Sequence, residues 1–125
     1  MVTSGEFEAL YQVTNVSKAI KRFEVRSGSK LGGLIVNIRR VKNEQQMVQD
    51  FAQKLGTQII GIIPYSQAIK ESGGQGETIF DVAPDSEEAK LYREIGQKVY
   101  DNKELVIPQT IEFEDLYDWW LKYIT

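Results

Sequence analysis

The sequence predicts an α/β fold in which a partial parallel sheet is flanked by helices. Two short apolar runs, Leu31–Asn37 and Gln58–Ile63, have the length and the β-branched residues of buried strands. Segments with apolar residues at helical spacing precede, separate and follow these runs. Because helices alternate with strands, we expect parallel strands joined by crossover helices. We expect residues 1–125 to form a single domain, since their number is typical of one domain.

The first two helices are expected on either side of the first strand. One begins after Ser4 and ends near Glu24, and six apolar residues recur along it at helical spacing. The other begins at Asn43, which forms a capping-box pattern with Gln46 three residues later. Gly56 is the expected left-handed residue after this second helix.

The second half of the chain is predicted to be mainly helical. Pro64 ends the second strand, and a short helix is expected over residues 66–71. Residues 72–77 hold three glycines and are expected to form a flexible loop, followed by a short extended piece at Thr78–Phe80. Two further helices are predicted, one over residues 86–101 with Ser86 as its cap and one from Thr110 onward.

The chain contains neither cysteine nor histidine. Their absence excludes disulfides, thiolate or histidine catalysis, zinc sites of the Cys/His type and ligation of an iron–sulfur cluster by these residues. A metal site made of carboxylates alone stays open. Carboxylates cluster at Glu87–Glu88 and at Glu112, Glu114 and Asp115, but both clusters lie in predicted first helical turns, where interaction with the helix dipole is sufficient explanation.

The net charge of the chain and the hydropathy of its sequence limit the kinds of partner that we expect it to bind. The net charge of −3 argues against a general nucleic-acid surface. Residues 1–54 carry nine Lys/Arg and five Asp/Glu, whereas residues 55–125 carry six and thirteen, so a basic half precedes an acidic one. No apolar run has the length of a membrane helix, and no signal peptide is evident. A cytoplasmic protein without a membrane or nucleic-acid partner is therefore expected.

Several segments occur in the order and spacing of a known family. They are Ser4–Glu6, Ala9–Tyr11, Asn15–Lys18, Leu31–Asn37 with Arg39, Lys54–Gln58, Ile63–Pro64, Tyr92–Val99, Asp101–Lys103 and Leu105–Pro108. Together they resemble the C-terminal half of the nitrogenase iron protein family over nearly the whole chain. The resemblance implies a fold of the P-loop NTPase type. It also implies a homodimer that hydrolyses MgATP and passes electrons from a bridging [4Fe–4S] cluster to a larger reductase.

The parts of that family that hold triphosphate and cluster lie in its N-terminal half. This chain has no Gly-x-x-x-x-Gly-Lys-Ser/Thr sequence and no cysteine. We therefore expect neither MgATP, MgADP nor the [4Fe–4S] cluster to bind tightly to this chain alone, and we expect no catalysis by it in isolation.

The resemblance also implies a site for the nucleotide base. Asn37 occupies the place of the asparagine that contacts adenine in the family, and the loop Pro64, Tyr65, Ser66 and Gln67 matches the loop that lines the base pocket. A carboxamide offers a donor and an acceptor together, which suits a purine edge. The family usually has Arg-Asp where this chain has Tyr65-Ser66. A segment with Glu6, Glu8 and Tyr11 matches one close to the nucleotide and the dimer interface.

Most of these residues could instead have structural roles. Asn37 could cap the end of its strand, and Arg39 and Arg40 could be solvated rather than anion contacts. The glycine-rich loop could be a linker or a docking segment. The pair Trp119–Trp120 could fasten the last helix, with one ring in the core and the other partly exposed, or form an association surface.

Three functions fit these observations. The first is the C-terminal segment of an ATP-dependent iron-protein reductase component that contributes adenine and dimer contacts. The second is a stand-alone, non-enzymatic binding or regulatory module derived from that family. The third is the related partitioning-type ATPase group, against which the Asn37 strand and the segment Asp101–Pro108 argue.

Overall fold

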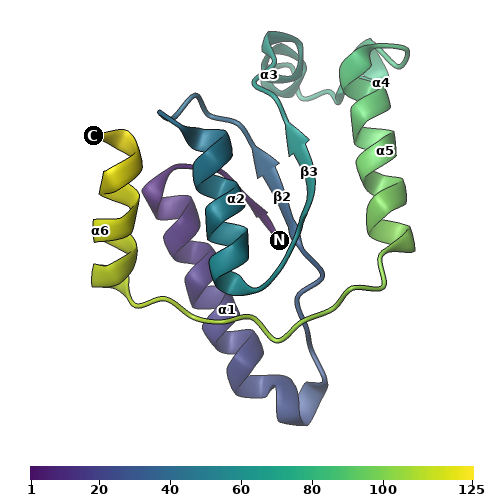
Figure 1. The fold of residues 1–125 in the computed structure, drawn as a ribbon. Helices are drawn as coiled ribbons and strands as arrows, with labels where there is room; N and C mark the ends of the chain where they lie inside the picture. Colours follow the sequence, from purple (N-terminus) through teal and green to yellow (C-terminus); the bar gives the residue numbers. More distant parts are fainter.

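The computed structural model describes all residues, 1–125, and its centre is a three-stranded sheet among helices (Figure 1). The elements in chain order are β1 (Val2–Thr3), α1 (Phe7–Ser27), β2 (Leu34–Asn37), α2 (Glu44–Leu55), β3 (Ile59–Ile63), α3 (Gln67–Gly74), α4 (Ile79–Val82), α5 (Glu87–Asp101) and α6 (Phe113–Ile124). The strand order is β1-β2-β3, and both pairings are parallel. The predicted α/β fold with a small parallel sheet is confirmed. None of the helices is both long enough and apolar enough to cross a bilayer.

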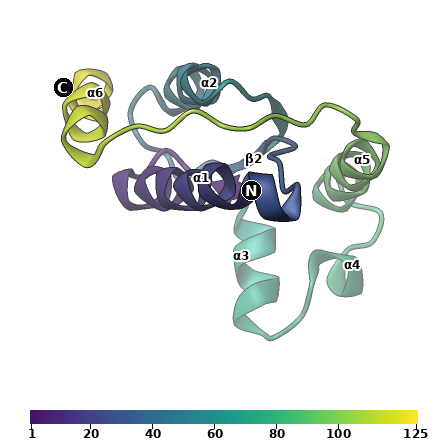
Figure 2. The same ribbon diagram turned by 90° about the horizontal axis from the view of Figure 1, so that it is seen from below.

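One face of the sheet is covered by three helices and contains the main core. Leu34 and Val36 of β2 are fully buried on this face. Leu34 packs in one cluster with residues of α1, α2 and α6, including Leu10, Phe51 and Leu116. Figure 2 shows these three helices on one side of the sheet and α5 on the other. The apolar stripes predicted for the first two helices therefore point to the same core.

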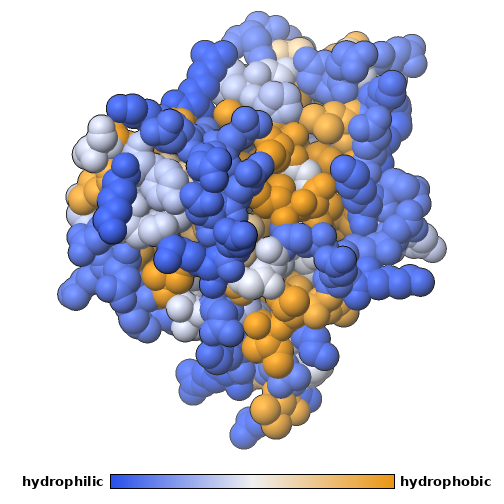
Figure 3. Space-filling model, viewed as in Figure 1, coloured by the Kyte–Doolittle hydropathy of each residue, from blue (hydrophilic) through white to orange (hydrophobic).

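The opposite face is covered only in part. Val2, Ile35 and Gly61 are in register across the three strands and share this face. α5 packs on Gly61 so closely that a Cβ there would lie 2.5 Å from Cγ1 of Ile95. Val2 at the other edge is 62% exposed. Figure 3 shows apolar side chains gathered between α2 and α5, along the edge of the sheet formed by β3.

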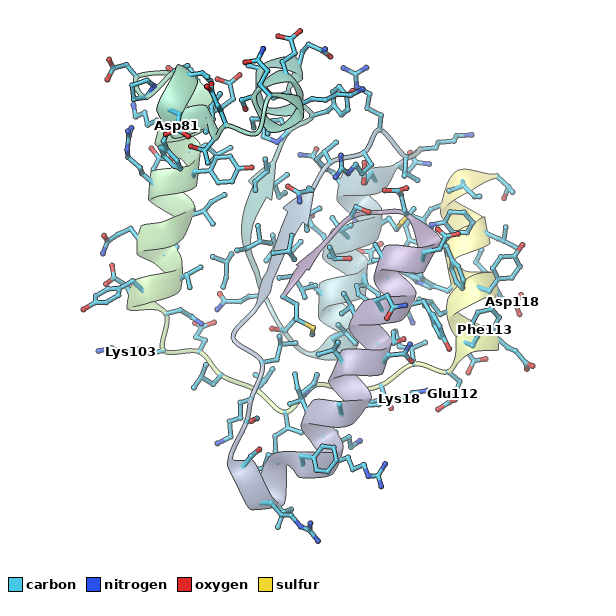
Figure 4. The ribbon with its side chains drawn as sticks, turned by 180° about the vertical axis from the view of Figure 1, so that it is seen from behind. Lys18, Asp81, Lys103, Glu112, Phe113 and Asp118 are labelled. Carbon is cyan, nitrogen blue, oxygen red and sulfur yellow. The ribbon has the colours of Figure 1, made fainter.

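The segment between α5 and α6 crosses the amino ends of the strands (Figure 1). Leu31 and Val106 exchange two backbone hydrogen bonds there, and Asn102 donates its side-chain amide to the Gly32 carbonyl. Lys18 of α1 forms an ion pair with Glu112 just before α6, with 3.3 Å between the charged atoms (Figure 4). These contacts place α6 beside α1.

Both tryptophans of α6 are half-buried and fasten this helix to the core. The Trp120 indole donates to the Gly5 carbonyl at 2.9 Å, and the Trp119 ring packs against Phe51. The Tyr123 hydroxyl donates to Asp50 of α2. Both rings therefore pack against the core, as the structural alternative expected, but neither is fully buried.

Three local predictions need correction. Asn43 has a left-handed backbone with φ of 57° and makes no capping hydrogen bond, so the capping box expected with Gln46 is absent. Its side-chain amide donates instead to the Tyr123 carbonyl. α1 continues past Glu24 to Ser27, where Gly28 adopts φ of 70°, and the last helix begins at Phe113 rather than Thr110.

The region around residues 72–80 also differs from expectation. α3 continues through Gly74, so residues 72–74 are helical, although the glycine content predicted a loop there. Thr78–Phe80 was expected to be extended, but Thr78 caps the short helix α4 in a capping box with Asp81. Strand β1 was not predicted, because two residues are too few to show a period of apolar residues.

We predict that Gly61→Ala lowers the free energy of unfolding by about 1–3 kcal/mol, because the new methyl group would overlap Ile95. Urea denaturation followed by circular dichroism measures the change. Gly96→Ala in α5 is the matched control. No atom lies within 4 Å of its added Cβ, so the variant should be more stable than the wild type by about 0.5–1 kcal/mol. Equal effects at both positions would contradict the packing described here.

We also predict that the free energy of unfolding falls at alkaline pH because Tyr123 ionises. Burial, the hydrogen bond to Asp50 and the charge of Asp50 raise the pKa of Tyr123 to about 12. An unfolded tyrosine ionises near pH 10, so the contact contributes fully below about pH 10 and its contribution is lost as the pH rises to about 12. Tyr123→Phe should be less stable at neutral pH and should lose less stability over this range. Urea unfolding at several pH values measures both; parallel curves for the two proteins would refute the assignment.

Candidate functional site

A pocket of about 340 Å³ lies beyond the carboxyl ends of β2 and β3. Its lining residues come from both strand ends, from the loops that follow and from α3 and α5. They are Asn37, Ile38, Arg39, Ile63, Pro64, Tyr65, Ser66, Ile69, Lys70, Gly73 and Tyr92. The structure therefore brings Asn37, Pro64, Tyr65 and Ser66 together. Gln67 is not among the lining residues, and its side-chain amide donates to Glu71 within α3.

The register of the sheet explains this convergence. Asn37 and Ile63 are paired at the ends of two parallel strands. The Ile38 amide donates to the Ile63 carbonyl at 2.9 Å, which extends the ladder by one residue. Both loops therefore leave the sheet at the same edge. The carboxyl edge of an open parallel sheet is where α/β proteins bind ligands.

Glu44, the first residue of α2, is a buried carboxylate that ties two of these loops together. It accepts hydrogen bonds from the backbone amides of Gly5 at 2.7 Å, Arg39 at 2.9 Å and Val41 at 3.1 Å. A carboxylate with three amide donors is well compensated for its burial. Glu44 thus fixes the segment after β1 relative to the loop after β2.

Sequence patterns alone do not identify Glu44 as a residue of the site. An acidic residue in a first helical turn is common, because it interacts favourably with the helix dipole. The residue in the sequence that reflects this contact is Gly5, because a Cβ at this position would lie 2.5 Å from Cγ of Glu44. The glycine permits the close approach, but its partner 39 residues away cannot be identified from one sequence.

The two arginines of the loop after β2 have partners within the chain. Arg39 Nε lies 4.0 Å from the Glu6 carboxylate, and both side chains are more than half exposed, so this ion pair is weak. Arg40 has a left-handed backbone with φ of 63°. Its guanidinium lies 4.2 Å from the ring centroid of Tyr65. The loop after β2 is thereby joined to the loop after β3.

Ser66 has a structural role in the loop after β3. Its hydroxyl caps α3 by accepting from the Ile69 amide, and it donates to the Glu88 carboxylate at 3.1 Å. The Lys70 ammonium donates to the Tyr65 hydroxyl at 3.4 Å. The hydrogen-bonding capacity of Ser66 is therefore largely used within the chain.

Asn37 is half-buried at the pocket. Glu44, and not Asn37, binds the backbone of the loop that follows β2. The carboxamide of Asn37 can therefore present both a donor and an acceptor to a bound molecule. With the apolar side chains of Ile63 and Ile69 beside it, the pocket suits a planar group with a polar edge.

The remaining candidates lie outside the pocket. Tyr11 packs in an aromatic cluster with Phe7 and Phe113 between α1 and α6. Glu6 and Glu8 do not line the pocket, although Glu6 faces Arg39. No group of three acidic side chains is arranged to hold a metal ion.

Comparison with known proteins gives one consistent result. A model of the 4Fe-4S iron sulfur cluster binding proteins, NifH/frxC family, matches residues 1–124. Nitrogenase iron protein 2 of Methanobacterium ivanovii is 40% identical over 120 residues, which are 94% of this chain and 44% of that protein. Nitrogenase iron protein 2 of Methanothermococcus thermolithotrophicus is 39% identical over 112 residues, 90% of this chain and 38% of that protein. The protein of the same name from Methanothermobacter thermautotrophicus is 32% identical over 123 residues, 98% of this chain and 45% of its own. The chain spans less than half the length of these relatives.

We predict that Glu44→Ala lowers the free energy of unfolding by about 2–3 kcal/mol, because three backbone amides lose a charged acceptor. Glu44→Gln keeps one acceptor oxygen and should cost about half as much. Urea denaturation measures both. The adjacent Gln45→Ala alters an exposed side chain and should change stability by less than about 0.5 kcal/mol. A Glu44→Ala variant as stable as this control would show that the carboxylate is dispensable.

Proposed function

The chain belongs to the NifH/frxC family of 4Fe-4S iron sulfur cluster binding proteins, and on that premise we propose that it is the base-recognising C-terminal part of an ATP-dependent iron-protein subunit. Such a subunit donates electrons to a larger reductase. The observation that supports this role is the pocket at the carboxyl ends of β2 and β3, where Asn37 meets the Pro64–Ser66 loop.

In this proposal the pocket receives the adenine of MgATP or MgADP. Asn37 bonds the polar edge of the base, and Ile63 and Ile69 contact its faces. Glu44 holds the loop after β2, and Ser66 holds the start of α3, so both sides of the pocket are positioned before a ligand enters. Preorganisation of this kind raises affinity because less ordering is required on binding.

The residues of this chain do not fit the family's iron–sulfur cluster, because there is no cysteine to ligate iron. They also lack a phosphate-binding loop. We therefore assign cluster ligation and phosphoryl transfer to another part of the subunit. The cluster, when present, supplies the electron that is transferred. The present residues contribute base selection, the sheet and the helices that cover it.

The incompletely covered face of the sheet supports the assignment of these functions to another part of the subunit. Val2 is exposed at the edge and Ile35 is only half-buried, on a face that α5 covers only at β3. Parallel sheets are usually covered on both faces. We propose that the phosphate-binding part of the subunit covers this face, and that two subunits form a homodimer that works with a reductase partner.

We predict that Asn37→Ala weakens binding of MgADP about 3–10-fold in a subunit that joins this segment to the family's phosphate-binding half, because one or two hydrogen bonds to the base are lost. Isothermal titration calorimetry measures the affinity. Folding should be nearly unchanged, since Asn37 is not in the core. Gln49→Ala on the exposed side of α2 serves as the control and should bind as the wild type does. Unchanged affinity in Asn37→Ala would remove the main site assignment.

A further inference from the structure

We infer that Tyr65 stacks on the base in this pocket, and that Arg40 and Lys70 are positioning residues that hold its ring. The inference rests on the proposed function, since it concerns the same pocket and the same base. The reasoning starts from the contacts of Tyr65, which are unusual for an exposed loop.

Tyr65 is half-buried and lies between two cations from different elements. The Arg40 guanidinium, from the loop after β2, lies 4.2 Å from its ring centroid. The Lys70 ammonium, from α3, donates to its hydroxyl at 3.4 Å. One contact acts on the face of the ring and the other on its tip. Together they favour one orientation of the ring before a ligand binds.

Arg40 contacts the Tyr65 ring but is not part of the pocket that Tyr65 lines. Tyr65 lines the pocket, whereas Arg40 lines a neighbouring recess with Val41 and Asn43. The base would stack on the ring face that the guanidinium does not cover. Arg40 holds this place with a left-handed backbone, a conformation that is unfavourable for a residue with a Cβ. The same loop is anchored by Glu44 at Arg39 and Val41, on both sides of Arg40.

The opposite wall of the pocket complements an aromatic ring. Asn37 supplies donor and acceptor atoms for a polar edge, and Ile63 and Ile69 supply apolar contact. Stacking on an aromatic side chain is available to any base, and it typically accounts for a fold-change of roughly ten or more on alanine substitution. A purine offers two fused rings to Tyr65 and a hydrogen-bonding edge to Asn37.

The test uses the 125-residue chain labelled with ¹⁵N and adenosine as the probe, followed by NMR. Adenosine lacks phosphate, so the measurement is independent of the phosphate-binding part of the subunit. We expect contacts between the Tyr65 ring protons and the base protons in nuclear Overhauser spectra of the wild-type chain. We expect Tyr65→Ala to weaken adenosine binding roughly tenfold, and Tyr65→Phe, which keeps the ring, to stay within about threefold of the wild type.

The positioning residues have a separate readout. Arg40→Ala should weaken binding less than Tyr65→Ala does and should broaden the Tyr65 ring signals, whereas Arg40→Lys should restore part of the affinity because an ammonium also binds a ring face. The neighbouring Lys42→Ala changes an exposed cation that does not contact Tyr65, and should leave binding unchanged.

The possible failures separate the two proposals. If Asn37→Ala weakens adenosine binding and Tyr65→Ala does not, the stacking role is overturned and the base pocket stands. If adenosine shifts no signal of the pocket residues at millimolar concentration, both the stacking role and the proposed base pocket fail. The Overhauser contact is measured in the wild-type chain, so it decides the question even if a variant does not fold.

Discussion

The buried carboxylate of Glu44 is the interaction on which the arrangement of this domain depends. It binds backbone amides in two loops at the carboxyl edge of the sheet, at Gly5 after β1 and at Arg39 and Val41 after β2. Trp120 of α6 binds the carbonyl of the same Gly5, so the last helix is fastened to the point that Glu44 holds. Loops otherwise have few internal constraints. Here one side chain sets the positions of two loops and indirectly of α6.

The candidate site follows from this constraint. With the loop after β2 held at Arg39 and Val41, Arg40 between them is placed over Tyr65 in the next loop. Ser66 then fixes the start of α3 and contacts α5 through Glu88. Asn37 lies at the end of β2, the central strand of the sheet, where it pairs with Ile63 of β3. A strand-end carboxamide beside an aromatic ring suits recognition of a planar base.

Much of the fold could be predicted from the sequence, because each apolar run or stripe that forms the core is local. Leu34 and Val36 mark a buried strand, and Met47, Phe51 and Leu55 mark one helix face. Features set by distant contacts could not be predicted. Asn43 had the pattern of a cap, but the anchor of that turn is Glu44, whose partner Gly5 is 39 residues away. The convergence of Asn37 with Pro64–Ser66 was expected from the resemblance, whereas the Arg40–Tyr65 contact depends on a left-handed backbone that sequence does not reveal.

The measurement that tests the central claim most directly is the mass of the endogenous protein, detected in its source cells with an antibody against this segment. We predict a species much larger than 14.3 kDa, because the base pocket described here is proposed to act together with a phosphate-binding part and a cluster-binding part. A species of 14.3 kDa would contradict the account. The chain would then act without those parts, and a binding or regulatory role would replace the role in electron transfer.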